Sequence, residues 1–468
     1  MSIATTPAPP VDVTLQSGID ALVAVLEDQL RTDHRRGLRT AAFASGYPGS
    51  PLGGLDTAID RRAEQLGALG LVHRRGSNEE LAMTAVMGSQ MSATYAEALH
   101  EGVLGVWYGK APGLERAADA FRHAVFAGVG PAGAVALVGD DPANKSSTLP
   151  SASEGMLAEL QVPVFAPGTV QEVRELGAHA IACSREVGLW TALKITTKVA
   201  DGHGAVHPAA EQVASPLGAG TVSRSLGSPT PVDREPELVE RLQDAAAYGA
   251  RHRLNDVVAA GSGATIAVVV SGTIQVEVSE ALAQLGIDES DLGALPIRLV
   301  RISQLFPLDR HQIRELCAGV DEVLVVEEKR PFLERSIRDL LYGGSHRPPV
   351  HGKYDADGNV LIPGSGALDA TRLVPALRRT LEPHLPAGRL RVPAGRTLPP
   401  IPLSEAPRTP FFCSGCPHST SLQAPEGAQV GVGIGCHGMV FNLPPERTGE
   451  LVGFTQMGGE GAQWVGTE

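Results

Sequence analysis

Three of the five cysteines in this 468-residue chain lie close together near its C-terminal end. Cys413 and Cys416 form a C-x-x-C pair in FCSGCPHST, and Cys436 follows in GVGIGCHGM. This spacing can hold two thiolates at one metal centre, and thiolates are soft ligands that suit zinc or an iron–sulfur cluster. With His418 or His437, the three thiols would also provide a Cys3His zinc set.

Two other interpretations stay open on spacing alone. A thioredoxin-like redox pair usually opens a helix directly after a strand, whereas this pair follows a Pro-rich stretch. The plain alternative is a set of small buried thiols in a turn and a strand. We do not expect His418 to bind the iron of a cluster at these thiols, because a C-x-x-C-P-H turn would have to bend sharply to bring its ring there.

The composition describes a globular protein without a cationic surface. Apolar residues make up 43% of the chain and the formal net charge is -13, so neither nucleic acid nor an anionic membrane is an expected partner. The N-terminal MSIATTPAPP lacks the regions of a signal peptide, and no apolar run reaches the roughly 18 residues of a membrane span. Five cysteines in this length do not form a disulfide framework. We therefore expect a cytoplasmic protein.

Strands alternate with helices through the first part of the chain. Apolar runs at 40–45, 102–109, 133–139, 163–167 and 189–195 are typical of strands, with helical patterns at 78–100, 114–127 and 170–183. This alternation predicts a mainly parallel, doubly wound α/β sheet, on which ligands bind at the carboxyl ends of the strands. The loops 46–54 and 140–148 follow strands directly and belong to that edge.

The whole chain divides into three α/β units with two connecting stretches. The first unit covers 15–200 and a linker with some helix covers 201–262. A second unit covers 263–345, with strands at 264–272, 297–302 and 322–328. A Pro- and Gly-rich connector covers 346–410, and the third unit covers 411–468.

Other motifs carry little weight by themselves. Two G-x-G-x-x-G matches, at 128–133 and 433–438, do not have the strand-then-helix context and length of a dinucleotide site. Glu79 and Glu80 open a helix, where acids complement the macrodipole. Four further polar residues, Ser50, Lys110, Arg116 and Lys145, are each expected to have a solvated surface role.

Seven stretches in chain order resemble one family: ASGYPGSPLGGLD, SNEELAMTAVMGSQ, VWYGKAPGLERAADAFRHA, GDDPANKSSTLP, FCSGCPH, GIGCHGM and FTQMGGEGAQWVG. They look like the thiamine-diphosphate-dependent 2-oxoacid:ferredoxin oxidoreductases, and most of all like the long fused indolepyruvate ferredoxin oxidoreductases of bacteria. The resemblance implies that 15–200 is the pyrimidine-binding domain, that 263–345 is a transketolase C-terminal-like domain, and that 411–468 starts the diphosphate-binding domain. The first and third domains together clasp thiamine diphosphate in that family.

The resemblance also implies roles for single residues. Glu79 matches the glutamate that contacts the aminopyrimidine ring of the cofactor and favours the tautomer that takes up a proton. Ser50, in the turn Tyr47-Pro48-Gly49-Ser50-Pro51, matches a hydroxyl near the substrate. The expected cofactor contacts are Tyr47, Pro48, Gly49, Glu79, Gly435, His437 and Gly458. Cys413, Cys416 and Cys436 match three of the four ligands of a [4Fe–4S] cluster.

The activity implied is oxidative decarboxylation of an aryl 2-oxoacid of the indolepyruvate type to its acyl-CoA, with electrons passed through the cluster to ferredoxin. A homo-oligomer is also expected. The family's Gly-Asp-Gly motif for diphosphate and magnesium, and the fourth cysteine, have no match before Glu468. We therefore expect an N-terminal part that needs further C-terminal domains for activity.

Two alternatives remain open at this stage. One is a non-redox thiamine-diphosphate decarboxylase or synthase with a structural zinc at the cysteines. The other is a non-catalytic fragment that binds partner domains.

Overall fold

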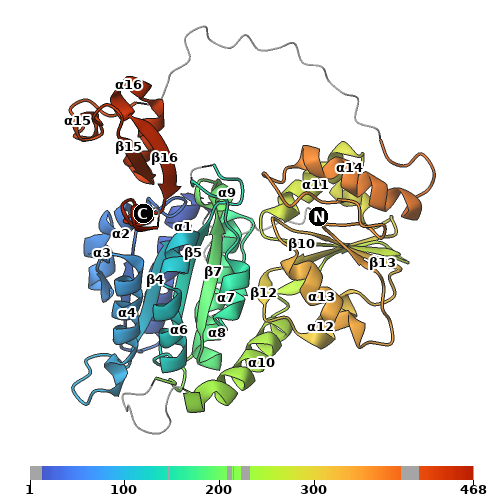
Figure 1. Ribbon diagram of the computed structural model, residues 1–468. Helices are drawn as coiled ribbons and strands as arrows, with labels where there is room; N and C mark the ends of the chain where they lie inside the picture. The colour runs from blue at the N-terminus through green and yellow to red at the C-terminus, as the bar shows by residue number, and fades with distance from the viewer. Residues whose placement is uncertain are drawn as a thin grey trace, which may run out of the picture. The chain divides into compact units, whose positions relative to one another are not determined.

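The computed structural model describes residues 13–391, apart from 146, 208–212, 214 and 223–231, and residues 411–466. The chain forms two compact units, which divide after residue 393. The first unit contains two large sheets and the second contains a small parallel strand pair. Figure 1 shows the elements in each unit.

A seven-stranded sheet forms the centre of the first half of the first unit. In spatial order its strands are β12 (Gln304–Phe306), β6 (Val164–Phe165), β7 (Trp190–Thr196), β5 (Ala134–Asp140), β4 (Gly102–Lys110), β2 (Thr40–Gly46) and β3 (Leu71–His73). All neighbours are parallel except β12, which runs antiparallel to β6. The predicted doubly wound α/β sheet is therefore confirmed.

Helices and a small ribbon surround this sheet. The helices are α1 (Gly18–Arg35), α2 (Leu55–Asp60), α3 (Ala63–Ala68), α4 (Glu79–Gln90), α5 (Ala111–Arg116), α6 (Ala118–Ala127), α7 (Glu154–Glu159), α8 (Val170–Val187), α9 (Thr197–Ala200) and α10 (Glu235–Arg251). The ribbon pairs β1 (Thr14–Ser17) with β8 (His203–Val206).

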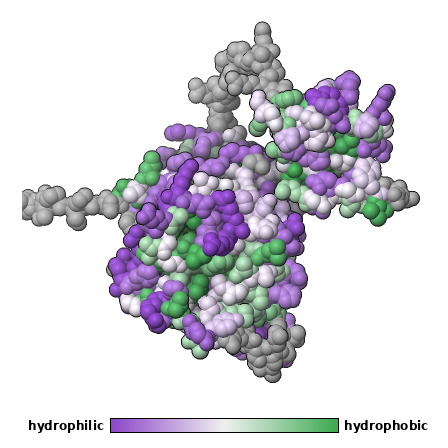
Figure 2. Space-filling model, turned by 90° about the vertical axis from the view of Figure 1, so that its left-hand side faces the viewer, coloured by the Kyte–Doolittle hydropathy of each residue, from purple (hydrophilic) through white to green (hydrophobic). Residues whose placement is uncertain are grey.

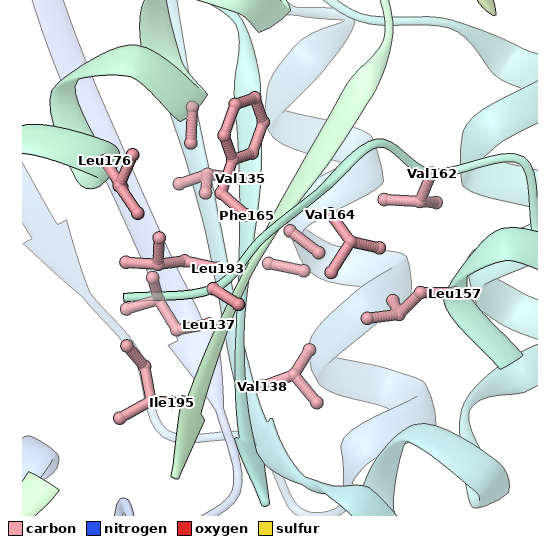
Figure 3. Close-up of a cluster of buried hydrophobic side chains, with 14 of the residues drawn as sticks. Val135, Leu137, Val138, Leu157, Val162, Val164, Phe165, Leu176, Leu193 and Ile195 are labelled. Atoms are coloured by element: carbon pink, nitrogen blue, oxygen red, sulfur yellow. The ribbon is translucent and has the colours of Figure 1, made fainter. Parts of the chain in front are cut away.

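The strands form where the sequence has continuous apolar runs, because parallel strands covered on both faces need apolar side chains on both faces. Every residue of β5 and β7 is buried. Figure 3 shows side chains from β5, β6 and β7, among them Val135, Phe165 and Leu193, packed with Leu157 of α7 and Leu176 of α8. This core fixes the strand ends that carry the candidate site.

The second sheet contains β14 (Val350–His351), β13 (Glu322–Val326), β10 (Ile266–Ser271), β11 (Ile297–Ile302) and β9 (Asn255–Ala260), in that spatial order. Only β9 is antiparallel to its neighbour. Its helices are α11 (Ile274–Gln284), α12 (Arg310–Leu316), α13 (Phe332–Tyr342) and α14 (Ala370–Leu381). In Figure 1, α11 and α14 cover one face of this sheet, and α12 and α13 cover the other.

Three sequence predictions about element bounds need correction. The helix predicted over 78–100 ends at Gln90, and only a 3₁₀ turn follows at Ser92–Thr94. Tyr95 and Leu99 beyond it are exposed, so a longer helix would have had no apolar face to bury.

The linker predicted over 201–262 contains the edge strand β9, and the connector predicted over 346–410 contains β14 and α14. Helix α14 packs its leucines, Leu373, Leu377 and Leu381, into the core of the second sheet. The remaining parts of these predictions, at 208–212, 214, 223–231 and 392–410, lie outside the described residues.

The second unit pairs β15 (Gln429–Gly433) with β16 (Glu450–Thr455) in parallel. Short helices accompany the pair: α15 (His418–Ser421), α16 (Pro445–Thr448) and α17 (Ala462–Val465), with a 3₁₀ segment at Gly435–Asn442. Its small core contains Phe412, Val432, Val440 and Leu443.

Candidate active site

The loops of the candidate site leave the seven-stranded sheet at the carboxyl ends of its parallel strands. The paired residues at this edge are Gly46 with Tyr108, Lys110 with Gly139, and Asp140 with Thr196. Because these strands are parallel and in register, the segments that follow them start at the same edge of the sheet. The edge predicted from the sequence is therefore where the structure brings these loops together.

The turn that contains Ser50 is held against two strands. The backbone N–H of Tyr47 donates to the carbonyl oxygen of Tyr108 over 3.2 Å. A Cβ placed on Gly139 of β5 would lie 2.9 Å from Cδ of Pro51, so the turn packs directly on that strand. The half-buried Ser50 is thereby fixed at the carboxyl edge.

Lys110, at the end of β4, lies beside this turn. A Cβ on Gly49 would lie 2.7 Å from Cδ of Lys110, so the alkyl chain of the lysine covers the glycine. The residue is half-buried, and within the described parts of the chain its ammonium group has no hydrogen-bond or ion-pair partner. The solvated surface role predicted for Lys110 needs correction, because its side chain is half-buried against Gly49. Lys110 ends a buried strand, and Ser50 lies in the turn that follows another one. This position at the carboxyl edge was the signal that could have identified Lys110 as a candidate site residue.

Glu79 is placed by the start of α4. Asn78 caps the helix, its side-chain oxygen accepting from the N–H of Leu81 over 2.8 Å. The indole N–H of Trp107 donates to the carbonyl oxygen of Glu79 over 3.1 Å. A Cβ on Gly113 would lie 2.7 Å from Oε1 of Glu79. The carboxyl group therefore lies against the glycine of the segment that follows β4.

The neighbouring Glu80 has different surroundings. Its side chain is exposed, and its carboxylate lies 4.0 Å from Nε of the equally exposed Arg116. Such a solvated pair contributes little. Glu80 thus fits the helix-end role expected of it, whereas Glu79 has a defined packing partner. The segment 110–113 contacts both predicted site regions, since Lys110 lies on Gly49 and Gly113 lies against Glu79.

A hydrogen-bonded chain that the sequence analysis missed supports the loop before α4. The hydroxyl of the buried Tyr108 lies 2.9 Å from Nε2 of His73, and Nδ1 of the same ring lies 3.0 Å from Asp60. The bond from His73 holds the pKa of Asp60 below its usual value, while burial, with Asp56 nearby, raises the pKa of Tyr108. Arg75 adds an ion pair to Asp56 at 3.2 Å. These bonds fix the edge strand β3, from which the chain reaches Glu79.

A second group is buried at the end of β7. The ammonium group of Lys194 pairs with Glu154 and lies 3.3 Å from Asp140. Both carboxylates stabilise the charged lysine and raise its pKa, which outweighs the opposing effect of burial. Asp140 also accepts from the N–H and the hydroxyl of Ser153, each over 2.9 Å. No sequence motif pointed to this group.

The loop that follows β5 is ordered around Asp141. Its carboxylate accepts the N–H of Lys145 over 2.9 Å and the N–H of Ser147 over 2.8 Å. The Lys145 side chain itself is exposed and pairs with Asp201 at 3.2 Å. It has the surface role that the sequence predicted.

The cysteines lie in the second unit. Cys413 and Cys416 form a turn in which the N–H of Cys416 donates to the carbonyl oxygen of Cys413 over 3.0 Å. Cys436 is exposed at the start of the 3₁₀ segment, and Nδ1 of His437 accepts from the N–H of Gly433 over 3.2 Å. Throughout 13–391 and 411–466, apart from the gaps given above, no three His, Cys, Asp or Glu side chains come together as a metal site.

The described structure therefore does not gather Cys413, Cys416 and Cys436 around one point, and we derive no step through a cluster. The His418 ring lies beside one of these thiols. Nδ1 of His418 lies 3.2 Å from Sγ of Cys416, because the turn continues directly into α15. The His418 ring also stacks on Phe412, with centroids 5.7 Å apart.

Gly435 and Gly458 have positive φ angles of 84° each. A Cβ on either would meet no atom within 4 Å, so both are needed for backbone conformation. With His437, they are the expected cofactor contacts of the second unit.

Comparison with known proteins finds likenesses to one group of oxidoreductases. A family model described as "Indolepyruvate oxidoreductase domain" matches residues 256–387, which carry the second sheet. The indolepyruvate oxidoreductase subunit IorA of Methanothermobacter thermautotrophicus is 28% identical over 397 residues, which cover 84% of this chain and 58% of the relative. IorA of Thermococcus kodakarensis is 25% identical over 425 residues, covering 87% of this chain and 60% of the relative.

Among solved structures, the 2-oxoglutarate:ferredoxin oxidoreductase of Magnetococcus marinus aligns with a TM-score of 0.56 at 13% identity. The alignment covers 80% of this chain and 66% of that chain, and it shows a shared fold. Together these likenesses support the assignment of the chain to the 2-oxoacid:ferredoxin oxidoreductase family, as its motifs predicted. The chain spans about three fifths of the length of the curated relatives it matches.

Proposed function

We propose that this chain provides the aminopyrimidine-binding and substrate-binding part of a thiamine-diphosphate-dependent 2-oxoacid:ferredoxin oxidoreductase. The observation that carries the proposal is the half-buried carboxyl group of Glu79 against Gly113, beside the loop edge that holds Ser50. The absence of a side chain at Gly113 leaves room for that carboxyl group. The helix cap at Asn78 fixes where α4 begins and therefore where Glu79 lies. These residues fit the pyrimidine end of the cofactor.

When bound, thiamine diphosphate supplies the electron sink for cleavage of the bond between the carboxyl and 2-oxo carbons. The chain's own residues bind and orient the cofactor and the substrate. Glu79 hydrogen-bonds a ring nitrogen of the aminopyrimidine and moves a proton at that atom. Ser50 donates its hydroxyl to the substrate. The ammonium group of Lys110 pairs with the substrate carboxylate, which supplies a partner that this lysine lacks among the described residues.

The substrate, the product and the electron acceptor are proposed from the names of the relatives. We propose an aryl 2-oxoacid of the indolepyruvate type as substrate, because the relatives described above are named for it. Acyl-CoA as product and ferredoxin as electron acceptor are proposed because the solved relative carries coenzyme A and is named for ferredoxin. A [4Fe–4S] cluster that brings Cys413, Cys416 and Cys436 together when it binds, and a magnesium ion with the cofactor diphosphate, complete the proposal. A reducing cytoplasm suits the five free thiols.

A homo-oligomer is proposed from one exposed face of the first unit. Figure 2 shows hydrophobic side chains gathered on the face that lies at the left of Figure 1, where α3 and α4 are found. Leu81 of α4 is 58% exposed, and Thr84, Ala85 and Gly88 continue the same exposed stripe at helical spacing. Small residues on such a stripe allow two helices to approach closely.

Among the helices of the described residues, none has the length and apolar character that a membrane span requires.

The proposal is tested by calorimetric titration of the assembled enzyme, which includes the further C-terminal domains, with thiamine diphosphate and magnesium, and then with indolepyruvate, phenylpyruvate and pyruvate. We expect the aryl 2-oxoacids to bind more tightly than pyruvate. Failure of every 2-oxoacid to bind would contradict the proposed function.

The pair formed by Cys416 and His418 favours a second candidate. Sulfur and imidazole nitrogen are ligands that zinc accepts, so a non-redox thiamine enzyme with a structural zinc is the alternative. Metal analysis of the anaerobically purified protein separates the two. Iron with acid-labile sulfide supports the oxidoreductase, whereas zinc without iron supports the alternative.

A further inference from the structure

A cavity of about 40 Å³ lies inside the first unit, between its two sheets. From the seven-stranded sheet it is lined by Glu154, Lys194 and Thr196, and from the second sheet by Thr273, Glu327 and Glu328. It is separate from the segment 110–113 and from Glu79, none of which line it. Its volume suits one ion or a very few water molecules.

The cavity occupies the switch point of the second sheet. Helix α11 leads from β10 to β11 on one side, whereas α13 leads from β13 to β14 on the other side and over the opposite face. The chain segments that follow β10 and β13 therefore part from each other. Ligands of open α/β sheets bind in the crevice that forms at this point.

Two buried polar atoms from opposite sides of the cavity have no hydrogen-bond partner within the described residues. One is Oγ1 of Thr196, a residue that is 9% exposed at the end of β7, and the other is Oε2 of Glu328, which follows β13. Buried polar atoms are almost always satisfied by protein, water or a bound ion. Both atoms are oxygens, and both residues line the same cavity.

The charges around the cavity are unbalanced. The ammonium group of Lys194 is already matched by Glu154 and Asp140. The carboxylate of Glu327 accepts N–H groups at the start of α13, those of Leu333 over 2.8 Å and Glu334 over 2.9 Å.

Two carboxylates, Glu327 and Glu328, thus remain beyond those that offset Lys194. The ammonium group of Lys353 donates to the backbone carbonyl oxygen of Glu327 and favours the charged form of that carboxyl group. The cations that act on Glu328 are, in order of decreasing effect, Lys329, Lys194, Lys198 and Lys353. Burial raises the pKa of Glu327 and of Glu328, which reflects the cost of holding both negative charges here. A bound cation would lower that cost.

We propose that this cavity binds a monovalent cation such as K⁺ or Na⁺, with Thr196 Oγ1 and Glu328 Oε2 among its oxygen ligands. Hard cations take oxygen ligands. Divalent ions usually require more carboxylates, and no set of three His, Cys, Asp or Glu side chains suited to a metal is found in the described residues. A cation held from both sheets would stabilise the packing of the two halves of the unit.

The first test measures the melting temperature of the full chain in KCl, NaCl and choline chloride at equal ionic strength. A ligand that binds only the folded state raises the melting temperature, and we expect a rise of about 2–5 °C in at least one alkali chloride. Thr196→Val keeps the shape of the side chain and removes the oxygen, and Glu328→Gln removes the charge. Each should abolish the rise.

Glu315→Gln is the matched control, because it removes one negative charge from an exposed residue of α12 that does not line the cavity. It should keep the rise. Equal melting temperatures of the wild-type protein in all three salts would overturn the proposal, as would a rise that both cavity variants retain.

The second test locates the ion directly, and it does not depend on any variant folding. Crystals of the wild-type chain are soaked in a thallous salt, since Tl⁺ replaces K⁺ and scatters anomalously. We expect an anomalous peak in contact with Thr196 and Glu328. Density of a water molecule only, with no anomalous peak in the cavity, would overturn the proposal.

Discussion

The carboxyl group of Glu79 lies so close to Gly113 that a methyl group at Gly113 would be 2.7 Å from its Oε1 atom. Gly113→Ala must therefore displace the carboxyl group, while Glu79, being half-buried, has space to move. A displacement of about 1 Å can cost roughly 10²-fold in rate. We expect a loss of this size in 2-oxoacid-dependent dye reduction by the assembled enzyme, with little change in melting temperature.

Gly67→Ala serves as the control for this substitution. A Cβ at Gly67 of α3 meets no atom within 4 Å. The variant should keep full activity. Full activity in Gly113→Ala would mean that the position of the Glu79 carboxyl group is unimportant.

The two adjacent glutamates should differ sharply. Glu79→Gln keeps the shape of the side chain but cannot exchange a proton, so activity should fall by about 10²–10⁴-fold, the usual contribution of general acid–base catalysis. Glu80→Gln removes only a solvated contact to Arg116 at 4.0 Å and should change activity little. Steady-state kinetics of both variants decide the point, and equal losses would remove the assignment of Glu79.

Ser50 is expected to hydrogen-bond the substrate. Loss of one such bond in a buried site costs about 1–3 kcal/mol, so Ser50→Ala should raise KM or lower kcat/KM by a corresponding factor. Ser50→Thr keeps the hydroxyl and should be tolerated. Unchanged kinetics in Ser50→Ala would indicate that the serine only shapes the turn that packs on Gly139.

Much of this architecture could be predicted from local pattern. The runs that became β2, β5 and β7 are mostly apolar, and a strand covered on both faces leaves that mark in the sequence. Helix α14 was missed because Pro375 lies inside it and Pro and Gly surround it, which together suggest an extended connector. Its leucines recur at helical spacing, but their burial depends on a sheet formed by distant residues.

The site was predictable only in part, for a related reason. Motifs identified roles for Glu79 and Ser50. The segment 110–113 lies within another of the family stretches, but its role as their shared neighbour was not identified. Its contacts depend on parallel pairing of β4 with both β2 and β5, which no local pattern encodes. The group formed by Lys194, Glu154 and Asp140 was missed for the same reason, since its members are up to 54 residues apart in sequence and meet only in the folded chain.

Lys110 should determine affinity for the anionic substrate. Lys110→Met keeps the unbranched chain that covers Gly49 and removes the charge, and loss of a charge-assisted bond corresponds to about 10–100-fold weaker 2-oxoacid binding. Lys110→Arg should retain most of the affinity. Lys145→Met removes the same charge from an exposed side chain and should have no effect. Calorimetric titration measures all three, and equal losses in Lys110→Met and Lys145→Met would point to net charge alone.

The pH dependence of stability should reveal Glu327. Burial raises the pKa of this carboxyl group from 4.5 to about 7, against the N–H groups of α13 that lower it. Its folded-state pKa is therefore above its unfolded value, so its contribution to stability is complete below about pH 4.5 and is lost as the pH rises through about 7. The contribution of Glu327 to the free energy of unfolding should fall across this window by an amount on the order of 1–3 kcal/mol.

His179 acts in the opposite direction at lower pH. Burial lowers its pKa to about 4, so its contribution is gained as the pH rises to about 6.5 and is constant above that value. Between pH 6.5 and 8 the contribution of His179 is constant, so a change in the free energy of unfolding in this range reports on the carboxyl groups. Glu327→Gln should be less stable than wild type at pH 6.5, because an amide accepts the α13 N–H groups less well, and the difference should shrink by pH 8. Urea unfolding across this range measures it, and parallel curves for the two proteins would show that Glu327 does not titrate there.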